Sequence, residues 1–320
     1  MLRLILKCVL IILILAILHL ALLSIQFPVE QSAYLAASID KKALLEDHTP
    51  GSILIVGGSS AAFSYDSAYL QSVTGQPVIN TSLHIGLGLR YMLDSVSPYI
   101  LPGDVIILNL EYEHYVVDSN NPPASDMLRQ ILGVDFATNF PLIRTPGQWL
   151  IVLKYHPEYT VNHIRQALYG SKSPCPNFIY CRESFNSHGD VKIEFVVSNA
   201  ETKARLANEI PYKDVEVYNA PLHPTTIQLL KDFNEFVTQK GAQVFIVLPA
   251  IPDAVYDRHP EYFEALFTAL GQALPIEIIG QTNIYPIDLF YDTMYHLNDR
   301  GRSIHMQSLA ELIRNRLNSS

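Results

Sequence analysis

Five short apolar runs, separated by segments of helical periodicity, constrain the fold of this 320-residue chain more than any other feature. The clearest run, 52–56 (SILIV), is bounded by glycines, as buried parallel strands often are. Strands that alternate with helices predict an α/β fold with a parallel sheet and helices on both faces. We expect strands at 52–56, 78–79, 104–110, 243–248 and 276–279, and helices at 67–73, 87–99, 225–239, 261–273 and 302–317.

Residues 115–222 break this rhythm. They contain the single tryptophan, Trp149, several prolines and glycines, and a helical stretch near 149–169. We interpret the segment as an insertion on one side of the sheet. The expected domain then covers 51–320, behind a short amphipathic stalk at 28–50 and a membrane anchor at 1–27.

The anchor prediction rests on twenty residues, Cys8 to Phe27, that carry no formal charge. A helix of that length spans about 30 Å, the thickness of a bilayer's hydrocarbon core. Arg3 and Lys7 precede the run, and the next basic residue is Lys41, so the soluble domain is expected on the extracytoplasmic side of the cytoplasmic membrane. A cleaved signal peptide is the alternative. The length of the run and the lack of a small-residue cleavage pair near 23–28 favour a retained single-pass anchor.

The charge of the chain and its cysteine and histidine spacing bear on whether it binds nucleic acid, a metal or a cofactor. The chain has 22 basic and 31 acidic residues, a net charge of −9, and no basic block, so nucleic acid is not an expected partner. The three cysteines form no CxxC pair and the histidines form no HxH or HExxH pair, so neither a metal nor another cofactor is expected. Cys175 and Cys181 bracket a polar loop, where a disulfide and two free thiols are both open interpretations.

The first predicted strand runs directly into Gly57-Gly58-Ser59-Ser60 and then into a helix. Such a junction places a side chain at the carboxyl end of the sheet, where the helix N–H groups can hold a developing oxyanion. The segment lacks the GxGxxG and GxxxxGK[ST] patterns of nucleotide-binding loops. A serine that only caps the helix explains this segment as well as a nucleophile does.

A second polar motif follows the last predicted strand. Asp292 stands four residues before His296 in a loop that leads into the final helix. A carboxylate close to a histidine fixes its tautomer and stabilises the imidazolium, as a general base requires. Together with the strand–GGSS–helix start, this order along the chain predicts nucleophilic catalysis by serine.

Three segments, ILIVGGSSAAF, NTSLHIGLG and TMYHLNDRG, together resemble the SGNH (GDSL-like) hydrolase superfamily. The resemblance is greatest to membrane-anchored relatives linked to envelope and exopolysaccharide modification, and it extends from about residue 52 to the C-terminus. It implies a flavodoxin-like three-layer sandwich. It also implies that Ser59 is the nucleophile, His296 the base, Asp292 the residue that orients the base, and Gly86 a donor to the oxyanion.

The chain departs from the family pattern at three places. Gly58 replaces the usual aspartate before the serine, and Thr293 stands where the acid of the last motif is expected. Glu111 and Glu113 occupy the region after the third strand, where the family has an asparagine that donates to the oxyanion. A carboxylate there would repel the developing charge unless it were protonated or turned away, and both glutamates are candidates for substrate binding.

The resemblance predicts a serine esterase or O-acyltransferase that acts on acyl esters of envelope or extracellular glycans. The expected partners are the acylated glycan, the membrane and envelope-assembly proteins. The alternative is a non-catalytic relative that binds glycan or takes part in its assembly. Glu111 and Glu113 favour that alternative, and the Ser59–His296 pair favours the enzyme.

Overall fold

The fold is described from a computed structural model of the whole chain. The description covers residues 2–23, 32–120, 125–139, 143, 145–169, 179–198, 200–209 and 220–319. Strands β1 (Ile53–Gly57), β2 (Val78–Asn80), β3 (Val105–Asn109), β4 (Gln243–Ile246) and β6 (Glu277–Ile278) form one sheet in the order β2-β1-β3-β4-β6. Every neighbouring pair in this sheet is parallel.

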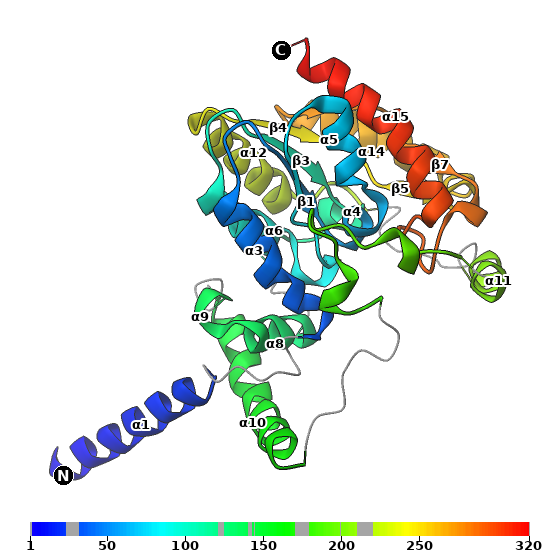
Figure 1. Ribbon diagram of the computed structural model, residues 1–320. Helices are drawn as coiled ribbons and strands as arrows, with labels where there is room; N and C mark the ends of the chain where they lie inside the picture. The colour runs from blue at the N-terminus through cyan, green and yellow to red at the C-terminus, as the bar shows by residue number, and fades with distance from the viewer. Residues whose placement is uncertain are drawn as a thin grey trace.

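Helices cover both faces of the sheet (Figure 1). The central strands are buried along their length, and alternate residues point to opposite faces. Ile53 and Ile55 of β1 pack with α5 (Ser67–Thr74) and α15 (Asp299–Leu317), whereas Leu54 and Val56 pack with α6 (Leu89–Val96) and α12 (Pro224–Gln239). The predicted α/β class, with a parallel sheet and helices on both sides, is therefore confirmed.

All five predicted strands form, and two short strands were missed. Strands β5 (Ala250–Pro252) and β7 (Asn283–Tyr285) pair in parallel as a separate two-stranded sheet. The run at 243–248 ends before Pro249, since β4 ends at Ile246. The separate strand β5 begins directly after this proline and pairs with three residues of β7.

The predicted stalk lies partly against the domain. Helix α3 (Ala37–Asp47) buries Leu45 in the same core as α6 and α12. Lys41 of α3 is also buried, with its ammonium donating to the carbonyl oxygens of Asn80 and Gly189. Residues 37–47 are therefore part of the packed body in this structure.

The N-terminal helix α1 (Leu2–Leu23) extends away from the α/β body (Figure 1). Its described large aliphatic residues are about half to two-thirds exposed. In the part of the chain that the structure describes, no helix combines the length and the apolarity needed to cross a membrane.

The segment 115–222 contains further helices and returns to the sheet. Helix α10 (Pro146–Tyr169) extends away from the α/β body, next to α1. Residues 179–198 lie against the α/β body (Figure 1). Asp190 accepts hydrogen bonds from the backbone and hydroxyl of Ser67 at the start of α5. The remaining helical elements are η1 (Tyr34–Ala36), α4 (Ser59–Ser64), η2 (Ile85–Leu87), η3 (Ser97–Tyr99), α7 (Glu113–Val116), α8 (Ser125–Val134), α9 (Phe136–Asn139), η5 (Arg182–Ser184), η6 (Ile193–Phe195), α11 (Ala200–Glu209), α13 (Asp253–Tyr256), α14 (Pro260–Ala273) and η9 (Ile287–Leu289).

Candidate active site

Ser59 is the first residue of α4, immediately after the turn that leaves β1. Gly57 permits this turn, because an added Cβ would lie 3.0 Å from the backbone carbon of Asn109 and 3.3 Å from Ala61 Cβ. The Ser59 side chain is half-buried, and no hydrogen bond to its hydroxyl or its N–H occurs among the described residues. The hydroxyl and the N–H are therefore both free to interact with a ligand.

Ser60 differs from its neighbour in both exposure and partners. Its side chain is buried, and its hydroxyl donates to Asn109 Oδ1 over 3.2 Å. Asn109 ends β3 and is itself fixed by donating from Nδ2 to the Val247 carbonyl oxygen over 2.9 Å. Ser60 therefore ties the start of α4 to the sheet, and Ser59 is the serine that faces outward.

Asp292 and His296 meet as their spacing predicts. The distance between His296 Nδ1 and Asp292 Oδ1 is 2.7 Å, and the His296 side chain is almost fully buried. Thr293, where the resemblance predicts an acid, accepts hydrogen bonds from the N–H groups of Tyr295 and His296, each over 3.2 Å. Thr293 thus stabilises the turn, and the turn brings the Asp292 carboxylate into contact with His296.

The ring of Phe63 links this loop to the helix that carries the serine. The Phe63 and His296 rings are stacked with a centroid distance of 3.8 Å and an interplanar angle of 10°. Phe63 stands four residues after Ser59, so both lie on the same face of α4, about 6 Å apart along its axis. The fold therefore brings His296 to the helix face on which Ser59 lies.

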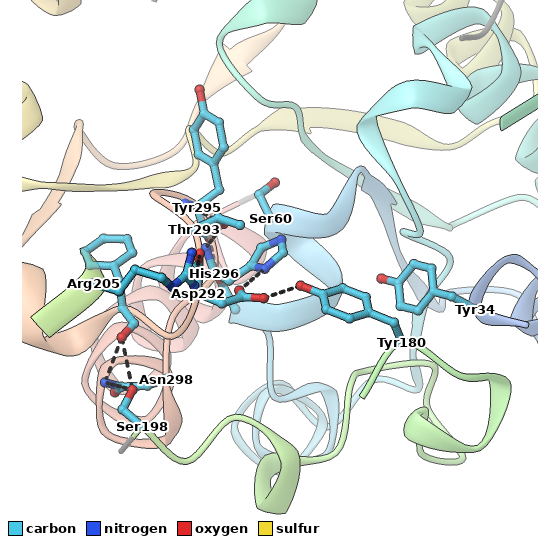
Figure 2. A network of polar contacts seen from close by, with 12 residues as sticks. Tyr34, Ser60, Tyr180, Ser198, Arg205, Asp292, Thr293, Tyr295, His296 and Asn298 are labelled. Atoms are coloured by element: carbon cyan, nitrogen blue, oxygen red, sulfur yellow. Dashed lines mark hydrogen bonds and ion pairs between the residues drawn. The ribbon is translucent and has the colours of Figure 1, made fainter. Parts of the chain in front are cut away.

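Sequence analysis missed a third partner in this network, Tyr180. Its hydroxyl donates to Asp292 Oδ2, on the carboxylate whose other oxygen contacts His296 (Figure 2). Tyr180 precedes Cys181, which is disulfide-bonded, and the Tyr34 ring packs against the Tyr180 ring at a centroid distance of 5.7 Å. Cys175, the other cysteine of the loop for which a disulfide and two free thiols were both open, lies outside the described residues, and Cys8 is a free thiol. Nothing local in the sequence could show that residue 180 meets residue 292.

These contacts set the ionisation of Asp292. Burial by itself raises the pKa of this carboxyl, but hydrogen bonds with His296 and Tyr180 and the positive charge of Arg205 outweigh burial and lower it. Asp292 is therefore held as a carboxylate. With His296 Nδ1 facing this carboxylate, Nε2 is the nitrogen left to exchange a proton with a ligand.

Gly86, the predicted oxyanion donor, lies in the loop after β2, but its N–H already has a partner. It donates to Nδ1 of His84 over 2.9 Å. Accepting this bond fixes the His84 tautomer, with Nε2 protonated in the neutral ring. Gly86 can serve an oxyanion only after His84 releases it.

Glu111 lies directly over Gly58. An added Cβ at Gly58 would be 2.6 Å from the Glu111 carboxyl carbon and closer still to both of its oxygens. Glu111 is buried, and its Oε1 accepts the Ser60 N–H over 3.0 Å. Gly58 and Glu111 are therefore sterically linked, because an aspartate at position 58 would overlap the Glu111 carboxyl group in this placement.

Glu113 points to the other side of the same turn. Its Oε2 accepts the hydroxyl of Tyr295 over 2.7 Å, next to the candidate base His296. Burial raises the pKa of Glu113, and the hydrogen bond from Tyr295 opposes this shift. The structure thus gives Glu113 a place in support of the His296 loop.

A cavity of about 320 Å³ opens beside this site, between α3, α6 and the loop after β2. Its lining residues include Gly57, His84, Lys41, Tyr91 and Asp135. Neither Ser59 nor His296 is among its lining residues. In the described ranges, no group of three or more His, Cys, Asp or Glu side chains is arranged to hold a metal ion.

No protein-family model matches the chain, and no curated protein matches it.

Proposed function

We propose that this protein is a serine esterase or O-acyltransferase that acts on acyl esters of envelope or extracellular glycans. The observation that carries the proposal is the juxtaposition of a hydrogen-bonded Asp292–His296 pair with the α4 face that presents Ser59. A partly buried carboxylate, an imidazole and an unbonded serine hydroxyl are the three parts of a hydroxyl-activating unit.

In the proposed reaction, Ser59 Oγ attacks the carbonyl carbon of an acyl ester while His296 Nε2 takes the hydroxyl proton. Asp292 stabilises the resulting imidazolium through Nδ1. The Ser59 N–H, at the first turn of α4, donates to the oxyanion. Collapse of the intermediate expels the alcohol, which receives the proton from His296, and leaves an acyl group on Ser59. Water, or a sugar hydroxyl, then attacks the acyl-enzyme by the same route.

We also propose the finer architecture that accompanies this activity. The strand order β2-β1-β3-β4-β6, with every pair parallel, supports a flavodoxin-like three-layer sandwich with its site at the carboxyl edge of the strands. The exposed aliphatic surface of α1 supports a role for this helix as a single-pass anchor in the cytoplasmic membrane. The soluble domain would then act on the extracytoplasmic side, near envelope-assembly proteins.

A specific observation keeps a second candidate in view. The N–H of Gly86 is bound to His84, and Glu111 stands where an amide donor is expected. An incomplete oxyanion site is what a non-catalytic glycan-binding relative would have. The two candidates differ in whether Ser59 forms a covalent bond.

The deciding experiment is the reaction of the full-length protein in detergent with a serine-directed alkyl phosphonate, read by intact mass. The enzyme gains one phosphonyl group, and Ser59→Ala does not. Ser60→Ala serves as the matched control and is labelled like the wild type, because its hydroxyl faces the sheet. If the wild type gains no mass at any phosphonate concentration, the non-catalytic glycan-binding protein is the better interpretation.

A further inference from the structure

The Glu111 carboxyl group has one satisfied oxygen and one without a partner. Oε1 accepts the Ser60 N–H, whereas Oε2 is buried and makes no hydrogen bond within the described residues. His114 Nδ1 is 3.4 Å from Oε2, which is too far for a good hydrogen bond. Both ring nitrogens of His114 are also buried without a hydrogen bond. Glu111 and His114 thus form a buried polar cluster, with atoms that lack hydrogen bonds, beside the turn between β1 and α4.

A negative charge on Glu111 would be poorly compensated in this place. Burial raises the pKa of Glu111, and the hydrogen bond from Ser60 only partly opposes the shift. Burial also lowers the pKa of His114 to about 4, so the neighbouring imidazole is neutral at neutral pH. The titratable groups that face Glu111 from the surrounding elements are His114, Glu113, Tyr115, His84, Tyr34 and His296. None of these groups is a permanent cation.

The position of the carboxyl group relates it to the reaction. It packs against Gly58, one residue before Ser59. It also accepts the N–H of Ser60, which is next to the Ser59 N–H in the first turn of α4. The other expected oxyanion donor, the Gly86 N–H, is already bound to His84. Of the two N–H groups expected to bind the oxyanion, only that of Ser59 is unbonded among the described residues.

We propose that Glu111 is a neutral carboxylic acid whose Oε2–H group donates a hydrogen bond to the oxyanion that forms at Ser59. At rest this hydroxyl is directed toward His114, whose neutral Nδ1 is too distant to hold it firmly. When the substrate carbonyl binds, the hydroxyl turns to that stronger acceptor. The proton stays on Glu111 throughout, and the negative charge returns to the carbonyl bond when the intermediate collapses. This inference rests on the proposed function.

The proposal predicts how pH acts on the rate. Above the pKa of Glu111 the group becomes a carboxylate and repels the oxyanion, so kcat/KM falls as the pH rises through that value. Glu111→Gln keeps both bonds, because its amide oxygen can accept the Ser60 N–H while its amide nitrogen donates. Since the amide does not titrate, kcat/KM of this variant should not fall as the pH rises. Glu111→Leu keeps the volume but removes the donor, and its kcat should drop about 100-fold to 1,000-fold.

The test combines two measurements on the full-length protein in detergent. The first is the infrared difference spectrum between wild type and Glu111→Gln at neutral pH, which should contain the carbonyl band of a protonated carboxylic acid. The second is the pH profile of kcat/KM with a small acyl ester for wild type, Glu111→Gln and Glu111→Leu. Glu113→Gln is the matched control, since its carboxyl group faces Tyr295 and should not remove the alkaline fall.

The outcomes separate this inference from the proposed function. If the infrared band is absent from the wild type, or depends on Glu113 alone, Glu111 is not neutral and the inference is wrong whatever the turnover. If Glu111→Gln has the same alkaline fall as the wild type, Glu111 does not donate. If the band depends on Glu111 but no ester turns over and no phosphonate reacts, the proposed function fails and the donor role fails with it, while the neutral acid remains.

Discussion

The two halves of the candidate site are supported in different ways. Ser59 lies in a turn between consecutive elements, and the groups that fix it come from strand ends next to it in the sheet: Gly57, Asn109 and Glu111. His296 lies in a loop that is fixed by side chains from distant parts of the chain. Tyr180 and Arg205, both from 115–222, contact Asp292.

This difference teaches how the site tolerates change. The serine half depends on close backbone packing, so a single added carbon at Gly57 or Gly58 displaces neighbouring atoms. The histidine half depends on several side-chain contacts to one carboxylate, and each can be lost separately. We therefore expect abrupt losses from changes in the serine half and graded losses around His296, with the reacting groups themselves as the exceptions.

The largest effect is expected at the two reacting side chains. Ser59→Ala and His296→Ala should each lower kcat for a small acyl ester about 10⁴-fold or more, and the double variant should be little worse than either. Ser60→Ala should stay within about fivefold of wild type and lose about 1–2 kcal/mol of stability, because Asn109 Oδ1 loses its donor. Steady-state kinetics and thermal unfolding measure both. An inactive Ser60→Ala beside an active Ser59→Ala would shift the nucleophile by one residue.

Asp292→Asn should rank next, with kcat about 10³–10⁴-fold lower, because an amide favours the wrong tautomer of His296. Asp288 is the other carboxylate close to His296 in the sequence. It faces Arg300 on the surface, at an N–O distance of 3.8 Å, and its carbonyl oxygen accepts a hydrogen bond from Asn298. The variant should therefore not be rescued. Asp288→Asn is the control, and a loss there comparable to that of Asp292→Asn would contradict the assignment.

Gly58→Ala tests the serine half without touching a reacting group. The new methyl group overlaps the Glu111 carboxyl group, so the carboxyl group or the turn must move, and activity should fall about 100-fold. Glu111→Ser in the Gly58→Ala background makes room for the methyl group, so the double variant should be more stable than Gly58→Ala alone. A double-mutant cycle by thermal unfolding should give a coupling of about 1–3 kcal/mol. Additive effects would show that the two positions do not compete for space.

The outcome of sequence reasoning follows the same division. The runs at 52–56 and 104–110 predicted strands β1 and β3, because a fully buried parallel strand needs a continuous apolar run. The short spacing of Asp292 and His296 predicted their contact, since a turn can close over four residues. Tyr180 was missed because its contact with Asp292 joins residues 112 positions apart through an irregular loop. The position of Glu111 over Gly58 was missed for a related reason: it depends on how far β3 extends beside β1.

Tyr180→Phe should have a moderate effect on the histidine half. Without the hydroxyl, Asp292 loses one of the hydrogen bonds that lower its pKa, so that pKa rises toward its ordinary value. A lowered carboxyl pKa stabilises the folded state above the unfolded pKa, and this stability is lost as the pH falls through the folded value. In Tyr180→Phe, acid loss of stability and activity should therefore begin at a higher pH. At neutral pH the kcat should be about tenfold lower.

Tyr291→Phe is the control for that prediction. Tyr291 stands next to Asp292 in sequence, and its hydroxyl makes no hydrogen bond among the described residues. Tyr291→Phe should lose stability and activity at the same low pH as the wild type. The idea that Tyr180 supports Asp292 would be wrong if Tyr180→Phe and Tyr291→Phe gave the same pH profile by circular dichroism and by turnover.

The smallest effect is expected for Arg205→Gln, because this side chain is exposed. Arg205 donates to the Asp292 carbonyl oxygen over 3.2 Å, and its charge helps to lower the pKa of the Asp292 carboxyl group. Exposed charge contacts contribute about 0–1 kcal/mol, so kcat/KM should fall less than about fivefold. Salt screens exposed charges, so the gap between variant and wild type should narrow from low salt to 1 M salt. A loss larger than that of Tyr180→Phe, or one that salt leaves unchanged, would mean that Arg205 holds the His296 loop by its shape and contacts and not by its charge.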